Sequence, residues 1–382
     1  MNFNLNSEQQ MLQDSVRRFV TKACSFENRM AQIKAGPSAS ARNWRAFAEN
    51  GWLAAALPES YGGLGGTVVD NVLIGMELGR GLVSDPFVGL GVLAAQTLAA
   101  CATDAQKEAL LPRLAEGTLR IALACSEPDA RGNPARVKTK AVPHAGGYAL
   151  HGHKTLVVGA PAADMLLVSA RIDGAGGDAG RVTLFLVEAG SAGLTQRALP
   201  LHDGTWAADV LLDGVQVSAD ARVGYGGDGL PALRLGLAHA VAAQSAELIG
   251  AMEAAIEATS GYLKVRKQFG VQIGSFQALQ HRMADMAAEM ELARSMLFAL
   301  LAAFEGGDET ALQYTASACK AFVCRAAKNV CGQAIQLHGG IGMTEEYAIG
   351  HYFKRAVVAD LVFGSSDQHE AACAAALERA LT

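Results

Sequence analysis

The strongest constraint on the fold is a long apolar stretch that polar residues interrupt at helical spacing. It covers residues 230–252 and is the most apolar long segment of the chain. Its interruptions include Arg234, His239, Gln244 and Glu247. Ionisable groups are costly inside a lipid bilayer, so they favour a buried helix of a globular protein over a membrane span.

Long helical patterns continue from this stretch to the C-terminus. They are predicted over residues 230–267, 275–305, 309–337, 343–361 and 367–380. Four or five long helices with short connections are typical of an antiparallel bundle. Another helical region runs from about residue 7 to residue 116, and its first helix is predicted to open with a capping box of Ser7 and Gln10.

The region between these two has a different texture. Short segments rich in Val and Leu, such as DMLLVSAR and VTLFLVEAG, alternate with Gly, Asp and Pro. They predict strands of an antiparallel sandwich or barrel. The predicted fold class is therefore α+β multidomain, with an N-terminal helical domain (1–118), a central antiparallel β domain (119–229) and a C-terminal four-helix bundle (230–382).

Composition narrows the class of protein. Hydrophobic residues make up 51% and charged residues 18%, which indicates a globular chain. The net charge is −5 and no long basic run occurs, which argues against nucleic acid as a partner. The opening MNFNLNSEQQ has no basic or apolar signal region, and the seven cysteines show no framework spacing. These features predict a cytoplasmic protein with reduced thiols.

Several short motifs allow both a functional and a structural interpretation. Residues 224–229 match GxGxxG, but no buried parallel strand precedes them, so an inter-domain turn is predicted. His151 and His153 share one strand face without an obvious third metal ligand. Asp367 and His369 could form an acid–base pair, although Asp367 also suits a helix N-terminus, and the structural role is favoured.

Two segments indicate contact with a phosphate or nucleotide. Arg266-Lys267-Gln268-Phe269-Gly270 ends one predicted helix, and the cation at such an end can hold a diphosphate. The glycine-rich run that starts at Gln336-Leu337-His338-Gly339-Gly340 lets backbone amides approach a ligand closely. Taken singly, each segment is equally compatible with a glycine-rich corner between helices.

Together these segments resemble the acyl-CoA dehydrogenase family over essentially the whole chain. The motifs ALPESYGGLGG, MELGRGL, ACSEPDA, RKQFGVQIGSFQALQHRMADM and IQLHGGIGMTEEY occur in the family's order. The chain is most similar to the small subunit of pimeloyl-CoA dehydrogenase-like enzymes, including its ending FGSSDQH at 363–369. The resemblance implies an N-terminal helical domain, a central β domain and a C-terminal four-helix bundle.

The resemblance also implies FAD as the cofactor, bound across a subunit interface. Arg266 and Phe269 would contact its diphosphate and adenosine region, with Gln277 nearby. The ADP half from a neighbouring subunit would be contacted by Gln336, Gly339 and Gly340, and the flavin ring edge would lie near Ser126. The implied reaction is α,β-desaturation of an acyl-CoA thioester, in which a base removes the α proton and hydride passes from Cβ to flavin N5.

The chain departs from the family where the catalytic base belongs. The usual glutamate position is Gly364, and the alternative position on the first long C-terminal helix is Ala240. The catalytic residue is therefore unknown, with Asp367, His369 and His239 as weak substitutes.

Other departures lie on the flavin-ring side. The family's Glu-Pro-Gly-Ala-Gly-Ser-Asp run appears as residues 127–133, with Arg131 among the changes. The tryptophan and threonine that flank the ring are Leu156 and Val158, and an arginine near the CoA end is Val241. ADP-side residues match the family, whereas ring and base positions do not.

The resemblance and its departures leave three functions open. The chain is expected to be a subunit of an acyl-CoA dehydrogenase of fatty acid metabolism, acting on a dicarboxylyl- or ring-derived acyl-CoA. Its expected partners are the acyl-CoA substrate, an electron-transfer acceptor and further subunits, in a homotetramer or in a heterotetramer with a second acyl-CoA dehydrogenase chain. The alternatives are a non-catalytic structural or FAD-completing subunit, and another flavin oxidase or monooxygenase on the same scaffold.

Overall fold

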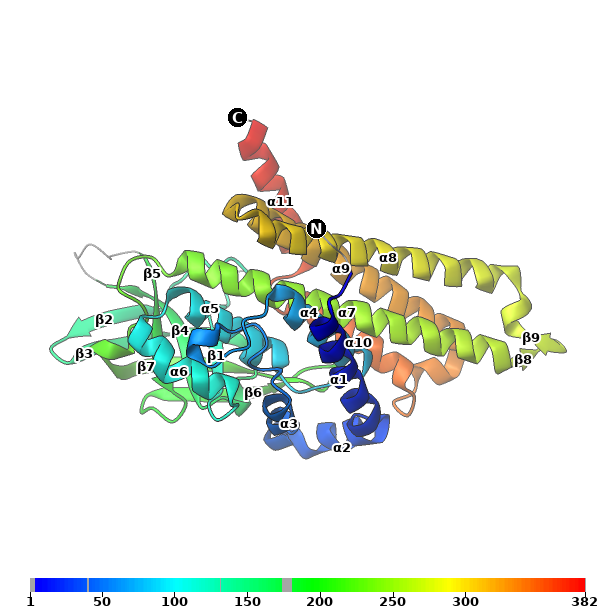
Figure 1. Ribbon diagram of the computed structural model, residues 1–382, viewed down its shortest axis with the longest axis horizontal. Helices are drawn as coiled ribbons and strands as arrows, with labels where there is room; N and C mark the ends of the chain where they lie inside the picture. Colours follow the sequence, from blue (N-terminus) through cyan, green and yellow to red (C-terminus); the bar gives the residue numbers. More distant parts are fainter. Residues whose placement is uncertain (1–3, 40, 131, 174–180, 382) are drawn as a thin grey trace. The chain divides into compact units, whose positions relative to one another are not determined.

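The computed structural model describes residues 4–39, 41–130, 132–173 and 181–381, and Figure 1 traces the chain. The predicted departure at Arg131 lies outside the described residues. The chain folds into two compact units. The helical unit comprises Met1–Met30, Val72–Val83 and Val241–Thr382, and the sheet unit comprises Ala31–Asn71 and Ser84–Ala240. The predicted domain boundaries at residues 118 and 229 stay a prediction.

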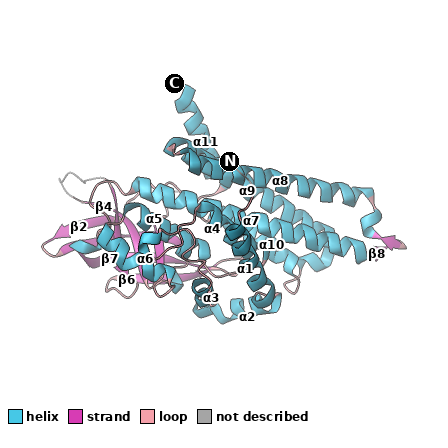
Figure 2. Ribbon diagram, viewed as in Figure 1, coloured by secondary structure: helices cyan, strands magenta, loops and turns pink. Residues whose placement is uncertain are grey.

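Long helices dominate the helical unit, as Figure 2 shows by colour. They are α1 (Ser7–Ala23), the second part of α7 (Leu230–Val265), α8 (Gln277–Gly306), α9 (Glu309–His338), α10 (Ala348–Leu361) and α11 (Ser366–Leu381). Helix α9 packs against α8, α10 and α11. Its buried side is lined by small residues such as Cys319, Ala327 and Ala334, which let neighbouring helices approach closely.

Helix ends differ from the predictions by a few residues. The helix predicted at 343–361 starts at Ala348, because residues Gly339–Met343 form a short 3₁₀ turn. The predicted capping box of Ser7 and Gln10 is wrong by one residue. Asn6 has the extended backbone of a cap, and its side-chain oxygen accepts the Gln9 N–H at 2.8 Å. Asn caps a helix at least as well as Ser, and the extended backbone places the cap one residue earlier.

Helix α4 (Val68–Arg80) and α7 touch through glycines in the helical unit. A Cβ at Gly79 would lie 2.0 Å from the Glu247 carbonyl oxygen, and one at Gly250 would lie 1.9 Å from that of Met76. No side chain fits at either position. This close approach sets the separation at which the charged side chains of the two helices meet.

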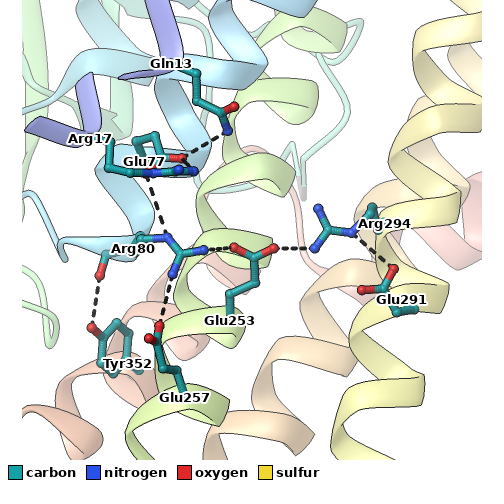
Figure 3. A network of polar contacts seen from close by, with 9 residues as sticks. All are labelled: Gln13, Arg17, Glu77, Arg80, Glu253, Glu257, Glu291, Arg294 and Tyr352. Carbon is teal, nitrogen blue, oxygen red and sulfur yellow. Dashed lines mark hydrogen bonds and ion pairs between the residues drawn. The ribbon is translucent and has the colours of Figure 1, made fainter. Parts of the chain in front are cut away.

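A polar network extends from this crossing through five helices (Figure 3). Buried Glu77 accepts hydrogen bonds from Arg17 at 2.7 and 3.1 Å. Arg80 forms an ion pair with Glu253, which also pairs with Arg294 of α8. The Arg80 carbonyl accepts the Tyr352 hydroxyl of α10 at 2.9 Å. Bidentate and shared contacts of this kind fix helix orientation as well as charge balance.

The sheet unit contains one seven-stranded sheet, with short helices α3 (Trp44–Glu49), α5 (Ala94–Cys101) and α6 (Asp104–Ala115) in the same unit. Its strands are β1 (Ile121–Ala124), β2 (Lys140–His144), β3 (Gly147–Val158), β4 (Met165–Ile172), β5 (Val182–Glu188), β6 (Leu194–Pro200) and β7 (Trp206–Ser218). The strand order is β1-β4-β2-β3-β7-β6, with β5 also paired to β4.

The predicted central β domain is confirmed, but the sheet is not wholly antiparallel. Strands β1 and β2 both pair with β4 in parallel, at Ile121↔Met165 and Lys140↔Arg171. The two strands follow one another along β4 like a single interrupted strand. The segment between them leaves the sheet and returns, which a local hydrophobic pattern cannot reveal.

The core of the sheet unit includes aromatic rings in tilted and edge-to-face contact. The Phe47 ring lies 5.3 Å from Trp52 and 6.3 Å from Phe87, and all three side chains are buried. Within the described residues, no helix is long and apolar enough to cross a membrane. In that same part of the chain, no group of three or more His, Cys, Asp and Glu side chains could hold a metal.

Candidate functional site

An exposed aromatic side chain marks the end of α7. Strands β8 (Lys267–Gln268) and β9 (Val271–Gln272) form a hairpin whose two loop residues are Phe269 and Gly270. Both have positive φ, 53° and 82°, as a type I′ turn requires. Asn is favoured at the first position, so Phe269 is strained there, and its side chain is 91% exposed. A strained, exposed aromatic residue points to a binding role.

The glycine-rich corner lies at the same end of the helical unit. Tyr262, in the last turns of α7, stacks on His338, the last residue of α9, with ring centroids 4.5 Å apart. The His338 Nδ1 donates to the Ala334 carbonyl at 2.8 Å, which holds the ring in place. This stack brings Arg266, four residues after Tyr262, and Gly339, the residue after His338, to one end of the bundle.

The corner has the open space that a nucleotide needs. A Cβ built at Gly339 or Gly340 meets no described atom within 4 Å, and both residues are exposed. Gly339 has φ 65°, whereas φ of Gly340 lies outside the left-handed region. Arg266, Gln277 and Gln336 are exposed as well. A guanidinium, amides and uncovered backbone are the donor set that suits a diphosphate, so this end fits the nucleotide part of FAD.

Ser126 belongs to the sheet unit and follows β1. Its carbonyl accepts the Thr155 N–H at 2.9 Å, which ties it to strand β3. The next residue, Glu127, is buried and accepts the Lys154 ammonium at 2.7 Å. Sequence reasoning named Ser126 alone and did not find this ion pair. The only signal in the sequence was that each residue lies in a segment that resembles the family, Glu127 in residues 127–133 and Lys154 close to Leu156 and Val158.

The positions that the resemblance places beside the flavin ring carry aliphatic side chains on an irregular strand. The register of β3 and β7 shifts between Lys154 and Val157, and Leu156 within this bulge has φ 53°. The Thr155 hydroxyl donates to Asp209 at 2.6 Å and anchors the bulge. Bulges redirect side chains, so Leu156 is aimed by the backbone although it cannot stack as an aromatic ring would.

The turn that the resemblance aligns with the family's base position holds no carboxylate, and a larger side chain at Gly364 would have to displace His369. Phe363 and Gly364 have φ of 63° and 98°. A Cβ at Gly364 would lie 2.8 Å from Nε2 of His369, so a larger side chain needs both an unfavourable backbone and a displaced imidazole. This turn is therefore built for glycine.

A buried lysine holds the same turn, and sequence reasoning missed it. Lys320 of α9 is 1% exposed and donates to the Gln244 side chain and to the carbonyls of Ala359 and Val362, the last at 2.8 Å. Burial lowers the pKa of Lys320. Three acceptors match the three donors of an ammonium group, and the C-terminal end of α10 favours a cation. A lone Lys within a helical pattern gives no sequence signal for this role.

The two histidines proposed as substitute bases are poorly suited to that task. His369 Nε2 donates to the Phe363 carbonyl at 3.0 Å, and Nδ1 accepts from the Ser317 hydroxyl at 3.2 Å. Burial lowers the pKa of His369 to about 4, and it does the same to His239 of the sheet unit. Groups with such low pKa values are weak bases, and both nitrogens of His369 are already engaged.

Asp367 is also occupied, but at the surface. Its side chain is 89% exposed and lies 3.0 Å from Arg325. It stands in the first turn of α11, where a carboxylate offsets the helix dipole. This matches the structural role favoured from sequence.

Comparisons with known proteins agree with this architecture. Family models described as the N-terminal, middle and C-terminal domains of acyl-CoA dehydrogenase match residues 6–118, 122–215 and 227–378. A probable acyl-CoA dehydrogenase, YngJ from Bacillus subtilis, is 31% identical over 378 residues, covering 96% of this chain and 97% of that protein.

Solved structures extend the comparison. The ChsE4–ChsE5 complex from Mycobacterium tuberculosis is 25% identical with a TM-score of 0.89, covering 99% of each chain. A variant of the Tcur3481–Tcur3483 steroid acyl-CoA dehydrogenase is 29% identical with a TM-score of 0.88, covering 98% of each chain. Other similar structures contain FAD or its reduced form, and FAD is the cofactor of this group. The predicted family and fold are confirmed: this chain belongs to the acyl-CoA dehydrogenase family of FAD-dependent oxidoreductases.

Proposed function

We propose that this chain is a FAD-binding subunit of a heteromeric acyl-CoA dehydrogenase whose partner chain supplies the catalytic base. The observation that carries the proposal is the Gly364 turn, which has no carboxylate and would accept one only with a strained backbone and a displaced His369. At the end of the bundle, by contrast, the Phe269 side chain is exposed and a Cβ at Gly340 would meet no described atom within 4 Å. These two features favour a chain that binds the cofactor but has no catalytic base of its own.

The residues proposed for FAD divide by the part of the cofactor they serve. Arg266 would neutralise diphosphate charge, and the exposed ring of Phe269 would cover the adenosine region, with Gln277 nearby. Gln336, Gly339 and Gly340 would receive the ADP half from a neighbouring subunit. Ser126 would face the flavin edge. When bound, FAD supplies the hydride acceptor of the desaturation.

The proposed partner and substrate are based on similar structures and on the family resemblance. Similar structures include heteromeric assemblies, such as ChsE4–ChsE5 and a complexed pair named as a steroid dehydrogenase. We propose an α2β2 heterotetramer acting on a dicarboxylyl- or ring-derived acyl-CoA, as the resemblance to pimeloyl-CoA dehydrogenase-like enzymes suggests. A structure of an electron transferring flavoprotein from Acidaminococcus fermentans matches at 28% identity, and a protein of that class is the proposed electron acceptor.

Production of this chain alone and together with a partner chain tests whether the partner supplies the catalytic base. The chain would be produced alone and together with a second acyl-CoA dehydrogenase chain that carries a glutamate base. Assembly mass, FAD per chain and bleaching of the flavin absorbance by acyl-CoA would be measured. We expect bleaching only in the joint assembly. Rapid bleaching of the lone chain would contradict the proposal, because no base of its own should suffice.

A glycine substitution tests the nucleotide site without disturbing the fold. Gly340→Ala adds a methyl group into open space with a permitted backbone, so folding should be unchanged. The FAD dissociation constant of the joint assembly should rise at least tenfold, because the methyl group occupies the space of the ligand. Gly306→Ala is the matched control, since its Cβ also meets nothing within 4 Å. Equal FAD affinities for both variants would place the cofactor elsewhere.

A further inference from the structure

We propose that the buried ion pair of Lys154 and Glu127 positions the segment that carries Ser126 at the flavin edge. The inference rests on the proposed function only for the location of the flavin. The ordering of the segment stands on contacts within the sheet unit. Both residues are positioning residues, since neither side chain is free to reach a ligand.

Lys154 is a fully buried cation within strand β3. Its side chain is 0% exposed, and Nζ lies 2.7 Å from Glu127 Oε1 and 3.0 Å from Ser169 Oγ. Burial lowers the pKa of Lys154, and the charge of Glu127 opposes that effect. An uncompensated ammonium in this position would be strongly unfavourable, so the pair must stay together in the folded protein.

The Glu127 carboxylate, held by Lys154, also accepts hydrogen bonds from the backbone and so fixes its position. Its Oε2 accepts the Lys138 N–H at 2.7 Å, and Oε1 accepts the Thr139 N–H at 3.1 Å and the Thr139 hydroxyl at 2.7 Å. Glu127 follows β1 closely, and Thr139 directly precedes β2. One carboxylate therefore joins the start and the end of the segment that leaves the sheet between these strands.

Strand β3 holds Ser126 from the other side. The Thr155 N–H donates to the Ser126 carbonyl at 2.9 Å, and Thr155 is the direct neighbour of Lys154. Ser126 and Glu127 are thus attached to two consecutive residues of one strand. Their neighbour Leu156, on the bulge, is brought into the same fixed arrangement. Two contacts on consecutive residues fix orientation as well as distance.

An apolar pair of similar size could fill this buried space equally well. Replacing buried ion pairs by well-packed apolar residues is often neutral for stability, so stability alone does not account for the pair. An apolar pair would leave the Lys138 and Thr139 amides without their acceptor. The geometry points to a role in ordering the segment, because four donors converge on a single carboxylate.

The test compares three variants of the full chain in the joint assembly. Glu127→Gln removes the charge and keeps the shape, and Glu127→Gln with Lys154→Met removes both charges, so a folded variant is available even if the first unfolds. Lys138→Met is the control, because the Lys138 side chain forms an exposed ion pair with Asp129 in the same segment. Amide hydrogen exchange between β1 and β2 and the flavin absorption spectrum are measured.

We expect at least a tenfold increase in amide exchange between β1 and β2 for the Glu127 variants, with no change for Lys138→Met or for α8 and α9. We also expect a shift of the flavin absorption bands. Unchanged exchange in the Glu127 variants would overturn the positioning role. Increased exchange with an unshifted spectrum would support positioning and refute the placement of Ser126 beside the flavin, so the two ideas fail separately.

Discussion

The imidazole of His369 lies against the position that the Cβ of a side chain at residue 364 would occupy. Only 2.8 Å separates its Nε2 from a Cβ built on that glycine, and the same nitrogen donates to the Phe363 carbonyl. Lys320 holds the neighbouring Val362 carbonyl from within the bundle. The position that the resemblance aligns with the family's base is therefore a hydrogen-bonded turn, supported by buried Lys320 and half-buried His369.

Restoring the glutamate alone should destabilise the chain. Gly364→Glu combines a backbone with φ 98° and a clash with His369, and the expected loss in free energy of unfolding is about 2–4 kcal/mol. Denaturant unfolding checks this. Adding His369→Ala should recover the part due to the clash and none of the part due to the backbone. A single variant as stable as the parent would show that the turn adapts easily.

Phe269→Asn should separate stability from cofactor binding. Asn is favoured at the first position of a type I′ turn. The free energy of unfolding should therefore stay within about 0.5 kcal/mol of the parent value, with any change in the stabilising direction. The FAD dissociation constant should rise at least tenfold, because the exposed ring is lost. Leu292→Asn, which alters an exposed leucine of α8, serves as the control with unchanged FAD affinity. Tight FAD binding by Phe269→Asn would remove this residue from the site.

The network around Glu77 should contribute measurably to stability. Glu77→Gln deprives Arg17 and Arg80 of a buried carboxylate, and the expected cost is about 2 kcal/mol because both arginines keep some solvent contact. Glu257→Gln removes an exposed partner of the same Arg80 and should cost less than about 0.5 kcal/mol. Urea unfolding of both variants distinguishes them. Similar losses would mean that burial of Glu77 is unimportant.

Stability should fall as the pH decreases from about 6.5 to about 4. Burial lowers the pKa of His369 from 6.5 to about 4, so the unfolded chain binds a proton in this range and the native chain does not. The contribution is complete above pH 6.5, and about 3 kcal/mol is lost by pH 4. The difference in unfolding free energy between the parent and His369→Gln should shrink across this range, since His239 contributes equally to both. A constant difference would show that His369 titrates normally.

Local patterns in the sequence predicted the elements and drew attention to the segments proposed to bind the cofactor. Apolar spacing predicted the long helices to within a few residues, because helix hydrogen bonds and periodicity involve only near neighbours. Short segments around Arg266 and the glycines after Gln336 indicated a phosphate or nucleotide contact, the resemblance added Phe269, and their binding role stays a proposal. The parallel pairing of β1 and β2 with β4 was missed, because pairing partners are distant in sequence.

Tertiary structure decided which of these residues meet and which candidates can act. The Tyr262–His338 stack unites two segments proposed to bind the cofactor at one end of the bundle, and no local pattern encodes it. Lys320 reaches Gln244, 76 positions away, and Val362, 42 positions away, so its hold on the Gly364 turn exists only after the helices pack. The sequence could report that a carboxylate is missing from residue 364. Only the packing of the whole chain could show that the His369 imidazole lies beside residue 364.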